Sequence, residues 1–181
     1  MKKIAYSGIE GCFAHTVARR LFPDELYVSF PGFYDAYESV VSRQCDLAVL
    51  PVENSYAGKV KEVIDILDKG ELNIIDTYSL PVVQNLIGLR GSRLDDIRIV
   101  ISQPKALEQC DHYIKVHGYG AIPSSNTAVA AQEVIRRQDM SHAAIASLET
   151  AARYGLKVLD EKINDKDDNK TTFAVLARRG I

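Results

Sequence analysis

The sequence predicts an α/β fold with mostly parallel sheets, arranged as two lobes around a cleft. Three observations support this fold class. Short apolar runs typical of buried strands alternate with segments whose apolar residues recur at helical spacing. Several strand-like runs end in polar side chains, as strands of an open α/β sheet do at their carboxyl ends. Two long strand-like runs meet at Pro81, which is expected where a chain crosses from one lobe to another.

The first part of the chain alternates regularly between strands and helices. Lys3–Ser7 is short and mostly apolar, which indicates a strand, and residues 13–22 carry apolar side chains at helical spacing. Leu26–Phe30 alternates as a strand does, and residues 34–41 place their apolar side chains on one face of a helix. The unbroken apolar run of residues 47–52 predicts a fully buried strand.

The rest of the chain continues the alternation and defines the lobes. Residues 60–67 have helical spacing, and strands are expected at 72–79, 82–89, 97–102, 142–146 and 172–177. Helices are expected after Pro104, after Asn126 and before Gly155. We expect one lobe of about residues 1–79 and 171–181, and a second lobe of about residues 80–170.

Composition excludes several classes of function. Of the 181 residues, 46% are hydrophobic and 25% charged, as in ordinary soluble proteins, and a net charge of −2 argues against nucleic-acid binding. No apolar run approaches the roughly 20 residues that span a membrane, and no signal-peptide core is present. The 3 cysteines predict free thiols in a reducing cytoplasm, with Cys12 a packed thiol rather than an activated one. The 4 histidines form no ligand cluster, so no metal site is expected.

The most informative segment runs from Asp46 to Ser55. An apolar run ends there in Glu53, Asn54 and Ser55, so that a carboxylate, an amide and a hydroxyl follow a buried strand. This is where an open sheet delivers ligand-binding groups.

Five predicted strand ends carry Ser, Asn or Thr just before a helix. Such residues are favoured N-caps, and capping alone explains any single junction. As a set, several helix N-termini at one cleft would bind a small carboxylate, because each supplies free N–H donors and a partial positive charge. The junctions are Ser7-Gly8, Glu53-Asn54-Ser55, Ser102-Gln103, Ser124-Ser125-Asn126-Thr127 and Ser147.

Seven segments together resemble the catalytic domain of the prephenate dehydratase family, in an order and spacing that cover almost the whole chain. The most diagnostic is 46–58, which contains Pro-Val-Glu-Asn-Ser, and the last, 169–173, resembles the signature Asn-x-Thr-Arg-Phe. The other segments are 6–15, 84–88, 102–110, 126–128 and 144–147.

The resemblance implies a two-lobed fold similar to type II periplasmic binding proteins. It also implies a lyase that converts prephenate to phenylpyruvate, carbon dioxide and water without a cofactor, as a step toward phenylalanine. The expected partner is prephenate, with a homodimer as a further expectation, and neither nucleic acid nor membrane is expected. Many relatives carry a phenylalanine-binding ACT domain, which we do not expect within a chain ending at Ile181.

Carried over residue by residue, the resemblance also assigns roles within the site. Thr171 is expected to donate a hydrogen bond or relay a proton to the departing hydroxide. Asn54 is expected to donate to the substrate, and Glu53 to orient its neighbours or, when protonated, to assist the hydroxide. The catalytic positions are completed by Ser102 and Gln109, which lie seven apart and are expected on one helical face. The substrate-binding positions are Ser55, Asn85, Thr127, Ser147 and Thr172.

Each catalytic assignment has a structural alternative. Thr171 is also an ordinary β-branched residue at the start of a strand, and Glu53 is also a cap for the next helix. Ser102 would otherwise be an N-cap, and Gln109 a buried helix amide.

Two positions depart from the family pattern. Thr172 stands where the signature has arginine, and Gln103 stands where histidine is usual. Threonine cannot replace the charge and bidentate hydrogen bonding of arginine, so weaker or altered activity is an open alternative. A prephenate decarboxylase that does not aromatise the ring and a non-catalytic carboxylate-binding module also stay open. Arogenate, the aminated form of prephenate, is an alternative substrate.

Overall fold

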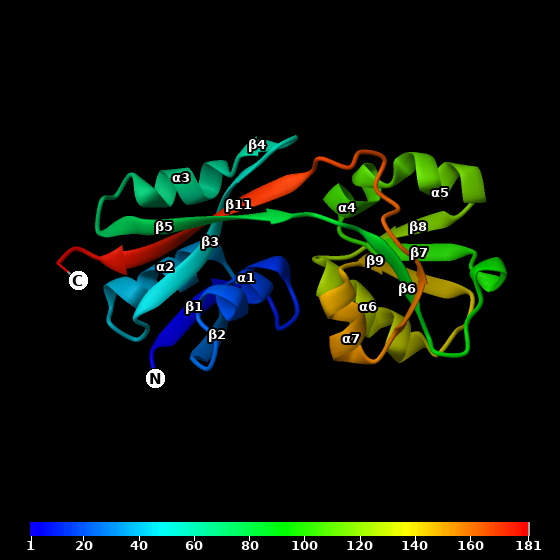
Figure 1. Cartoon of the computed structure of the whole chain (residues 1–181), viewed down its shortest axis with the longest axis horizontal. Coiled ribbons are helices and arrows are strands. Elements are labelled where there is room, and N and C mark those ends of the chain that lie inside the picture. Colours follow the sequence, from blue (N-terminus) through cyan, green and yellow to red (C-terminus); the bar gives the residue numbers. More distant parts are fainter. Residues whose placement is uncertain (181) are drawn as a thin grey trace. The chain divides into compact units, whose positions relative to one another are not determined.

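The computed structural model describes residues 1–180, which form two compact units (Figure 1). The first unit contains residues 1–81 and the chain from Asp168 onward, and the second contains residues 82–167. The first unit is therefore discontinuous in sequence, whereas the second is one continuous segment.

A 6-stranded sheet forms the centre of the first unit. The strand order is β2-β1-β3-β11-β5, and the short β4 pairs with β3. Strand β11 comes from the C-terminal end of the chain and lies between β3 and β5, so it completes this sheet. The strands are β1 (Lys3–Ser7), β2 (Leu26–Phe30), β3 (Leu47–Asn54), β4 (Gly58–Lys59), β5 (Leu72–Pro81) and β11 (Lys170–Arg178).

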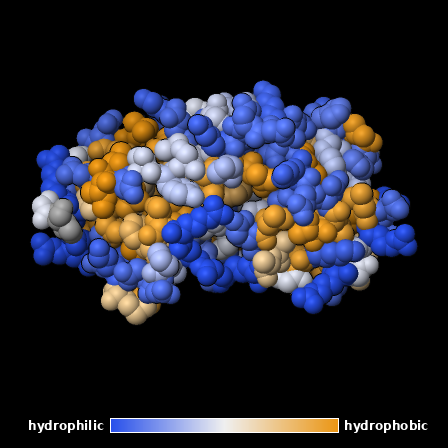
Figure 2. Space-filling view, viewed as in Figure 1, coloured by the Kyte–Doolittle hydropathy of each residue, from blue (hydrophilic) through white to orange (hydrophobic). Residues whose placement is uncertain are grey.

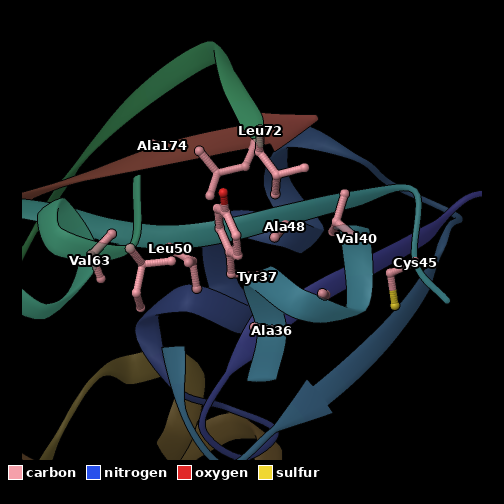
Figure 3. Packing of buried hydrophobic residues seen from close by; sticks show 12 residues of the cluster. Ala36, Tyr37, Val40, Cys45, Ala48, Leu50, Val63, Leu72 and Ala174 are labelled. Carbon is pink, nitrogen blue, oxygen red and sulfur yellow. The ribbon is translucent and has the colours of Figure 1, made fainter. Parts of the chain in front are cut away.

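Helices cover both faces of this sheet because its central strands are apolar on both. In β3, Ala48 and Leu50 pack with α2 and α3, whereas Val49 packs with α1. Figure 3 shows the first of these cores, in which Tyr37 of α2 lies fully buried close to Leu50 and Ala174. The helices are α1 (Phe13–Leu21), α2 (Phe33–Val41) and α3 (Lys61–Leu67).

The second unit is built around a 5-stranded sheet in the order β10-β6-β9-β7-β8. Alternate residues of its buried strands again enter two cores, one with α4 and α5 and the other with α6 and α7. The strands are β6 (Asn85–Gly88), β7 (Ile99–Ser102), β8 (Gly120–Pro123), β9 (His142–Ala146) and β10 (Lys157–Asp160). The helices are the 3₁₀ turn η1 (Leu94–Asp96), α4 (Pro104–Gln109), α5 (Asp111–His117), α6 (Thr127–Arg137) and α7 (Leu148–Tyr154).

The α/β class is confirmed, but the expectation of mostly parallel sheets is wrong. Five strand pairs within residues 1–180 are antiparallel and four are parallel. Strand β11 is antiparallel to both of its neighbours. A buried apolar run is typical of a strand in either direction, so its residues do not encode parallel pairing.

Several short elements were not predicted. Strands β4, β8 and β10 have 2 to 4 residues and lie at sheet edges, where little apolar periodicity is required. The single helix expected after Pro104 is two helices, α4 and α5, which meet at Cys110.

The surface mixes polar and apolar residues. Figure 2 shows hydrophobic residues interspersed with hydrophilic ones on the face in view. On the edge strand β5, Ile74 and Ile75 are about half exposed. Across residues 1–180, every helix is too short or too polar to cross a membrane.

Candidate active site

Asn54 lies at the end of β3 and is fixed by the turn that follows. The strand is buried over residues 47–50 and becomes more exposed toward its end. Asn54 Oδ1 accepts hydrogen bonds from the backbone N–H groups of Tyr56 at 3.0 Å and Ala57 at 3.1 Å. An asparagine that bonds the backbone just ahead of it closes an Asx turn. The Oδ1 side of the amide is thereby committed to the turn, and its Nδ2 side faces β11.

Strand β11 brings Thr171 beside Asn54, although the two lie 117 positions apart in the chain. The antiparallel register pairs these residues, and Asn54 Nδ2 donates to Thr171 Oγ1 at 3.0 Å. The same nitrogen donates to Asn169 Oδ1 at 2.8 Å and to the Lys170 carbonyl at 3.2 Å. The structure thus joins two residues that the sequence placed in one site.

The hydrogen bond from Asn54 determines what the Thr171 hydroxyl can do. Because Thr171 Oγ1 accepts from Asn54, its own hydrogen is available to a further acceptor. Donation to the oxygen also polarises the hydroxyl and strengthens it as a donor. Thr171 is only half-buried, so a ligand can approach it. This arrangement can present a neutral donor to an oxygen atom of a ligand.

Ser55 and Asn169 hold the same two segments together. The Ser55 N–H donates to the Lys170 carbonyl, and the Lys170 N–H donates to Ser55 Oγ, both at 3.0 Å. Asn169 is 4% exposed, and its Nδ2 has no hydrogen-bond partner among residues 1–180. Asn169 opens the signature-like segment 169–173, but no role was predicted for it. Its burial directly after the exposed run 165–168 is seen only in the structure, and the sequence carries no local signal for it.

Glu53 and Thr172 belong to the other face of the sheet. The register pairs them with each other, just as it pairs Asn54 with Thr171. Side chains of successive strand residues point to opposite faces, so Glu53 does not share the face of Thr171. Thr172 Oγ1 lies 3.0 Å from Ser79 Oγ of β5. Glu53 is exposed, and its side chain makes no hydrogen bond or ion pair within the described part of the chain.

In the second unit, Gln109 contacts another amide side chain. Gln84 Nε2 donates to Gln109 Oε1 at 3.3 Å. Gln84 is fully buried, and its Oε1 has no partner within residues 1–180. The Gln84 N–H donates to Asn164 Oδ1 at 2.6 Å, and the Asp165 N–H donates to the Gln109 carbonyl at 2.8 Å. Gln84 is a second residue to which the sequence gave no role, although it opens the segment 84–88.

Ser102 is fully buried at the end of β7, and its Oγ donates to the Ile145 carbonyl at 2.7 Å. The expectation that Ser102 and Gln109 share one helical face is wrong, because α4 begins only at Pro104. Gln103, not Ser102, is the N-cap of that helix.

Asn85 is likewise buried, and both ends of its amide are engaged within the second unit. Its Nδ2 donates to the Ala146 carbonyl at 3.1 Å, and its Oδ1 accepts from the Lys162 N–H at 3.1 Å. These bonds tie β6 to β9 and to the segment after β10.

Ser147 and Thr127 lie at helix starts. Ser147 is the N-cap of α7 and accepts from the Thr150 N–H at 3.1 Å. Thr127 is the first residue of α6, whose N-cap Asn126 accepts from the Val129 N–H at 2.8 Å. Side-chain capping is therefore confirmed at two of the five junctions. It is wrong at the other three, whose N-caps make no such bond and are Cys12, Val60 and Gln103.

A buried histidine and a half-buried thiol lie at the start of α1. His15 Nδ1 accepts from the Gly11 N–H at 3.0 Å, and burial together with the nearby charge of Arg19 lowers the pKa of His15. Cys12 Sγ donates to the Ser7 carbonyl at 3.4 Å, and burial raises the pKa of its thiol. Cys12 is thus a packed thiol, as predicted.

Among the described residues, no group of three or more His, Cys, Asp or Glu side chains is arranged to hold a metal ion. A surface pocket of about 340 Å³ in the second unit is lined by His112, Tyr113 and Lys162 among others. None of the predicted site residues lines it.

A family model and two curated relatives agree on the family to which the chain is similar. The family model described as prephenate dehydratase matches residues 4–181. The chain is 38% identical over 176 residues to arogenate dehydratase/prephenate dehydratase 1, chloroplastic, of Arabidopsis thaliana, covering 97% of this chain and 45% of that protein. It is 38% identical over 149 residues to the prephenate dehydratase of Methanocaldococcus jannaschii, covering 82% of this chain and 53% of that protein.

Solved structures agree with this placement. The prephenate dehydratase of Arthrobacter aurescens, in complex with L-Phe, superposes with a TM-score of 0.89 at 29% identity, over 99% of this chain and 61% of that one. A periplasmic substrate-binding protein from Coxiella burnetii, at 10% identity, shares only the fold, with a TM-score of 0.50 over 98% of this chain and 84% of that one. The expected likeness to periplasmic binding proteins is confirmed. The chain spans about half the length of the curated relatives it matches.

Proposed function

Because the chain belongs to the prephenate dehydratase family, we propose that it catalyses the decarboxylation and dehydration of prephenate to phenylpyruvate. The observation that carries this proposal is the Asn54–Thr171 pair, in which an oriented amide leaves the threonine hydroxyl hydrogen available. A packing role for Thr171 would not require this arrangement.

The chemistry of prephenate explains the need for such a donor. The bond between the ring and its carboxylate breaks, carbon dioxide leaves, and the electron pair enters the ring. The carbon–oxygen bond at the opposite ring carbon breaks at the same time, so the ring becomes aromatic. Hydroxide is a poor leaving group unless a proton or a strong hydrogen bond reaches its oxygen. The Thr171 hydroxyl supplies that hydrogen bond. The departing hydroxide takes the Thr171 proton as it becomes water, and Thr171 regains a proton from the solvent.

The remaining site residues divide between binding and positioning. We assign Gln109 to substrate binding, because its amide nitrogen is not used in its bond with Gln84. Ser102 and Asn85 use their polar groups within the second unit, so we assign them to positioning. Glu53, on the face away from Thr171, is not assigned to the departing hydroxide.

A product assay tests the proposed activity. Purified protein is incubated with prephenate, and phenylpyruvate and carbon dioxide are measured in the same samples. The proposal predicts both products in equal amounts. Carbon dioxide without phenylpyruvate would identify a decarboxylase, and binding without either product would identify a carboxylate-binding module.

The substrate is proposed to be prephenate rather than arogenate. The archaeal relative supports this choice, while the Arabidopsis relative carries both activities in its name. Arogenate has an ammonium group where prephenate has a ketone. Parallel measurements of kcat/KM decide the question, because a larger value for arogenate would contradict the choice.

We also propose that the protein acts in the reducing cytoplasm. Its 3 cysteines are free thiols, two of them fully buried, and such thiols persist where disulfides do not form. The Arabidopsis relative is chloroplastic by name. Thiol titration of freshly isolated protein under denaturing conditions should find three free thiols, and a disulfide would contradict the proposal.

A further inference from the structure

Asn169 is a buried amide in a strongly polar stretch of chain. It follows the exposed residues 165–168 and precedes exposed Lys170, yet its own side chain is 4% exposed. Burying an amide costs free energy unless its groups are hydrogen-bonded. The interactions of this side chain therefore need an explanation.

The oxygen of Asn169 takes part in orienting the candidate catalytic pair. Asn54 Nδ2 carries two hydrogens and faces three acceptors, of which Asn169 Oδ1 at 2.8 Å is nearest and Thr171 Oγ1 follows at 3.0 Å. The Lys170 carbonyl, at 3.2 Å, already accepts from the Ser55 N–H. When Asn169 holds one hydrogen of the Asn54 amide, the other is directed to Thr171.

Without Asn169, the two hydrogens of the Asn54 amide would no longer be divided between Asn169 and Thr171. Its Oδ1 would still be tied to the turn by two backbone N–H groups. Its Nδ2 would then have only Thr171 Oγ1 and the Lys170 carbonyl as acceptors, and neither of its hydrogens would be held away from them by Asn169. The carbonyl competes directly, because both of its lone pairs can accept.

The nitrogen of Asn169 gives a second and independent observation. Asn169 Nδ2 is buried and has no hydrogen-bond partner among residues 1–180. Buried polar groups are almost always satisfied, and an unsatisfied one destabilises the fold. An apolar residue at this position would avoid that cost, so stability alone does not explain the amide.

We propose that Asn169 is a positioning residue for Thr171. It acts through Asn54, whose amide it orients so that Thr171 Oγ1 is an acceptor and the Thr171 hydrogen is presented to the substrate. The inference rests on the proposed dehydratase function and adds a residue to its machinery. It concerns the rate of the chemical step rather than the binding of substrate.

The test compares three variants with the wild-type chain, using kcat and KM for prephenate together with the thermal midpoint. Asn169→Ala removes both ends of the amide. Asn169→Asp keeps an oxygen facing Asn54. Asp168→Ala is the matched control, because Asp168 is an exposed neighbour whose contact with Ser55 uses only its backbone carbonyl.

Asn169→Ala is expected to lower kcat about 10- to 100-fold, as loss of an orienting hydrogen bond does, with KM changed by less than about threefold. Asn169→Asp is expected to recover most of kcat, and the repulsion between its charge and the anionic substrate should appear in KM. Asp168→Ala is expected to resemble the wild type. In the double variant, adding Asn169→Ala to Thr171→Ala is expected to lower kcat by less than a further factor of about two, since Asn169 acts through Thr171.

Several results would overturn the inference. One is a folded Asn169→Ala protein with wild-type kcat, and another is an effect of this substitution on KM alone. A third is a loss of kcat on Asn169→Ala that is equally large whether or not Thr171 is present. If Asn169→Ala does not fold, Asn169→Asp decides alone, and a kcat reduced more than about 100-fold would count against the role. A wild-type chain that makes no phenylpyruvate would overturn the proposed function itself, which separates the two failures.

Discussion

At the scale of single residues, Tyr37 fills the centre of the core shown in Figure 3, where its hydroxyl has no partner among residues 1–180. Such an unsatisfied group destabilises the fold. Tyr37→Phe is therefore expected to raise the free energy of unfolding by about 1 kcal/mol, measured by urea denaturation. A loss of more than about 1 kcal/mol would show that the hydroxyl binds a buried partner.

His15 gives a prediction about pH. Its pKa is lowered in the folded protein, so the unfolded chain takes up the proton first as the pH falls. The stabilisation from neutral His15 is thus fully present above the ordinary histidine pKa of about 6.5 and is lost progressively below it. His15→Asn keeps an acceptor for the Gly11 N–H but does not titrate in this range.

The wild type should therefore lose stability more steeply than His15→Asn between about pH 6.5 and 5, by at most about 1.4 kcal/mol per pH unit. Urea denaturation at several pH values measures the difference. Parallel stability curves for the two proteins would show that His15 contributes nothing to the pH dependence.

Single residues also show what the sequence could and could not predict. Asn54 was predicted from the buried apolar strand that it follows, whereas Thr171 was assigned only through the resemblance to the family. The roles of Asn169 and Gln84 were not, because their partners depend on which distant segments become neighbours. No local pattern around either residue encodes that pairing.

At the scale of helices and strands, Ser147 has two candidate roles, substrate binding and helix capping. It was predicted to bind substrate, but it caps α7 through its hydroxyl. Ser147→Ala is expected to cost about 1 kcal/mol of stability, with kcat/KM changed less than about threefold. Ser125→Ala, at an exposed serine, is the control. A loss of turnover without a loss of stability would favour the binding role.

The elements themselves were largely predictable, but their pairing was not. Apolar periodicity located the main strands and helices, from Lys3–Ser7 to the strand that begins near Thr172. The prediction of mostly parallel strands was wrong, as β11 and β5 show: they run antiparallel for their whole length. Edge strands such as β8 were missed, because their residues are mostly exposed and need no apolar pattern.

At the scale of the whole molecule, the two units differ in whether one continuous segment of the chain contains all their strands. The second unit is the continuous segment 82–167, with its own sheet and two cores. The first unit needs β11 from the far end of the chain in the middle of its sheet. We expect residues 82–167 alone to unfold cooperatively in urea, whereas residues 1–81 alone should not.

Circular dichroism of the two fragments measures this difference. Adding a peptide of residues 168–181 to fragment 1–81 should restore some strand signal, since it supplies the missing β11. Cooperative unfolding of residues 1–81 alone would contradict the account of this sheet.

The division into two such units was suggested by the two strand-like runs that meet at Pro81. The sequence also indicated that the last strand rejoins the first part of the chain. It did not indicate that this strand enters the centre of the sheet and pairs Thr171 with Asn54. That register produces the candidate site.

The most direct test of the central claim is the steady-state turnover of prephenate by Thr171→Ala and by Thr172→Ala. The two threonines are adjacent in sequence but belong to opposite faces of β11. Thr171→Ala should lower kcat at least about 100-fold with little change in KM, because it removes the donor for the departing hydroxide. Thr172→Ala should lose less than about tenfold, since its hydroxyl contacts Ser79 instead. Equal losses in the two variants, or wild-type kcat in Thr171→Ala, would contradict the assignment of Thr171 as the hydrogen-bond donor.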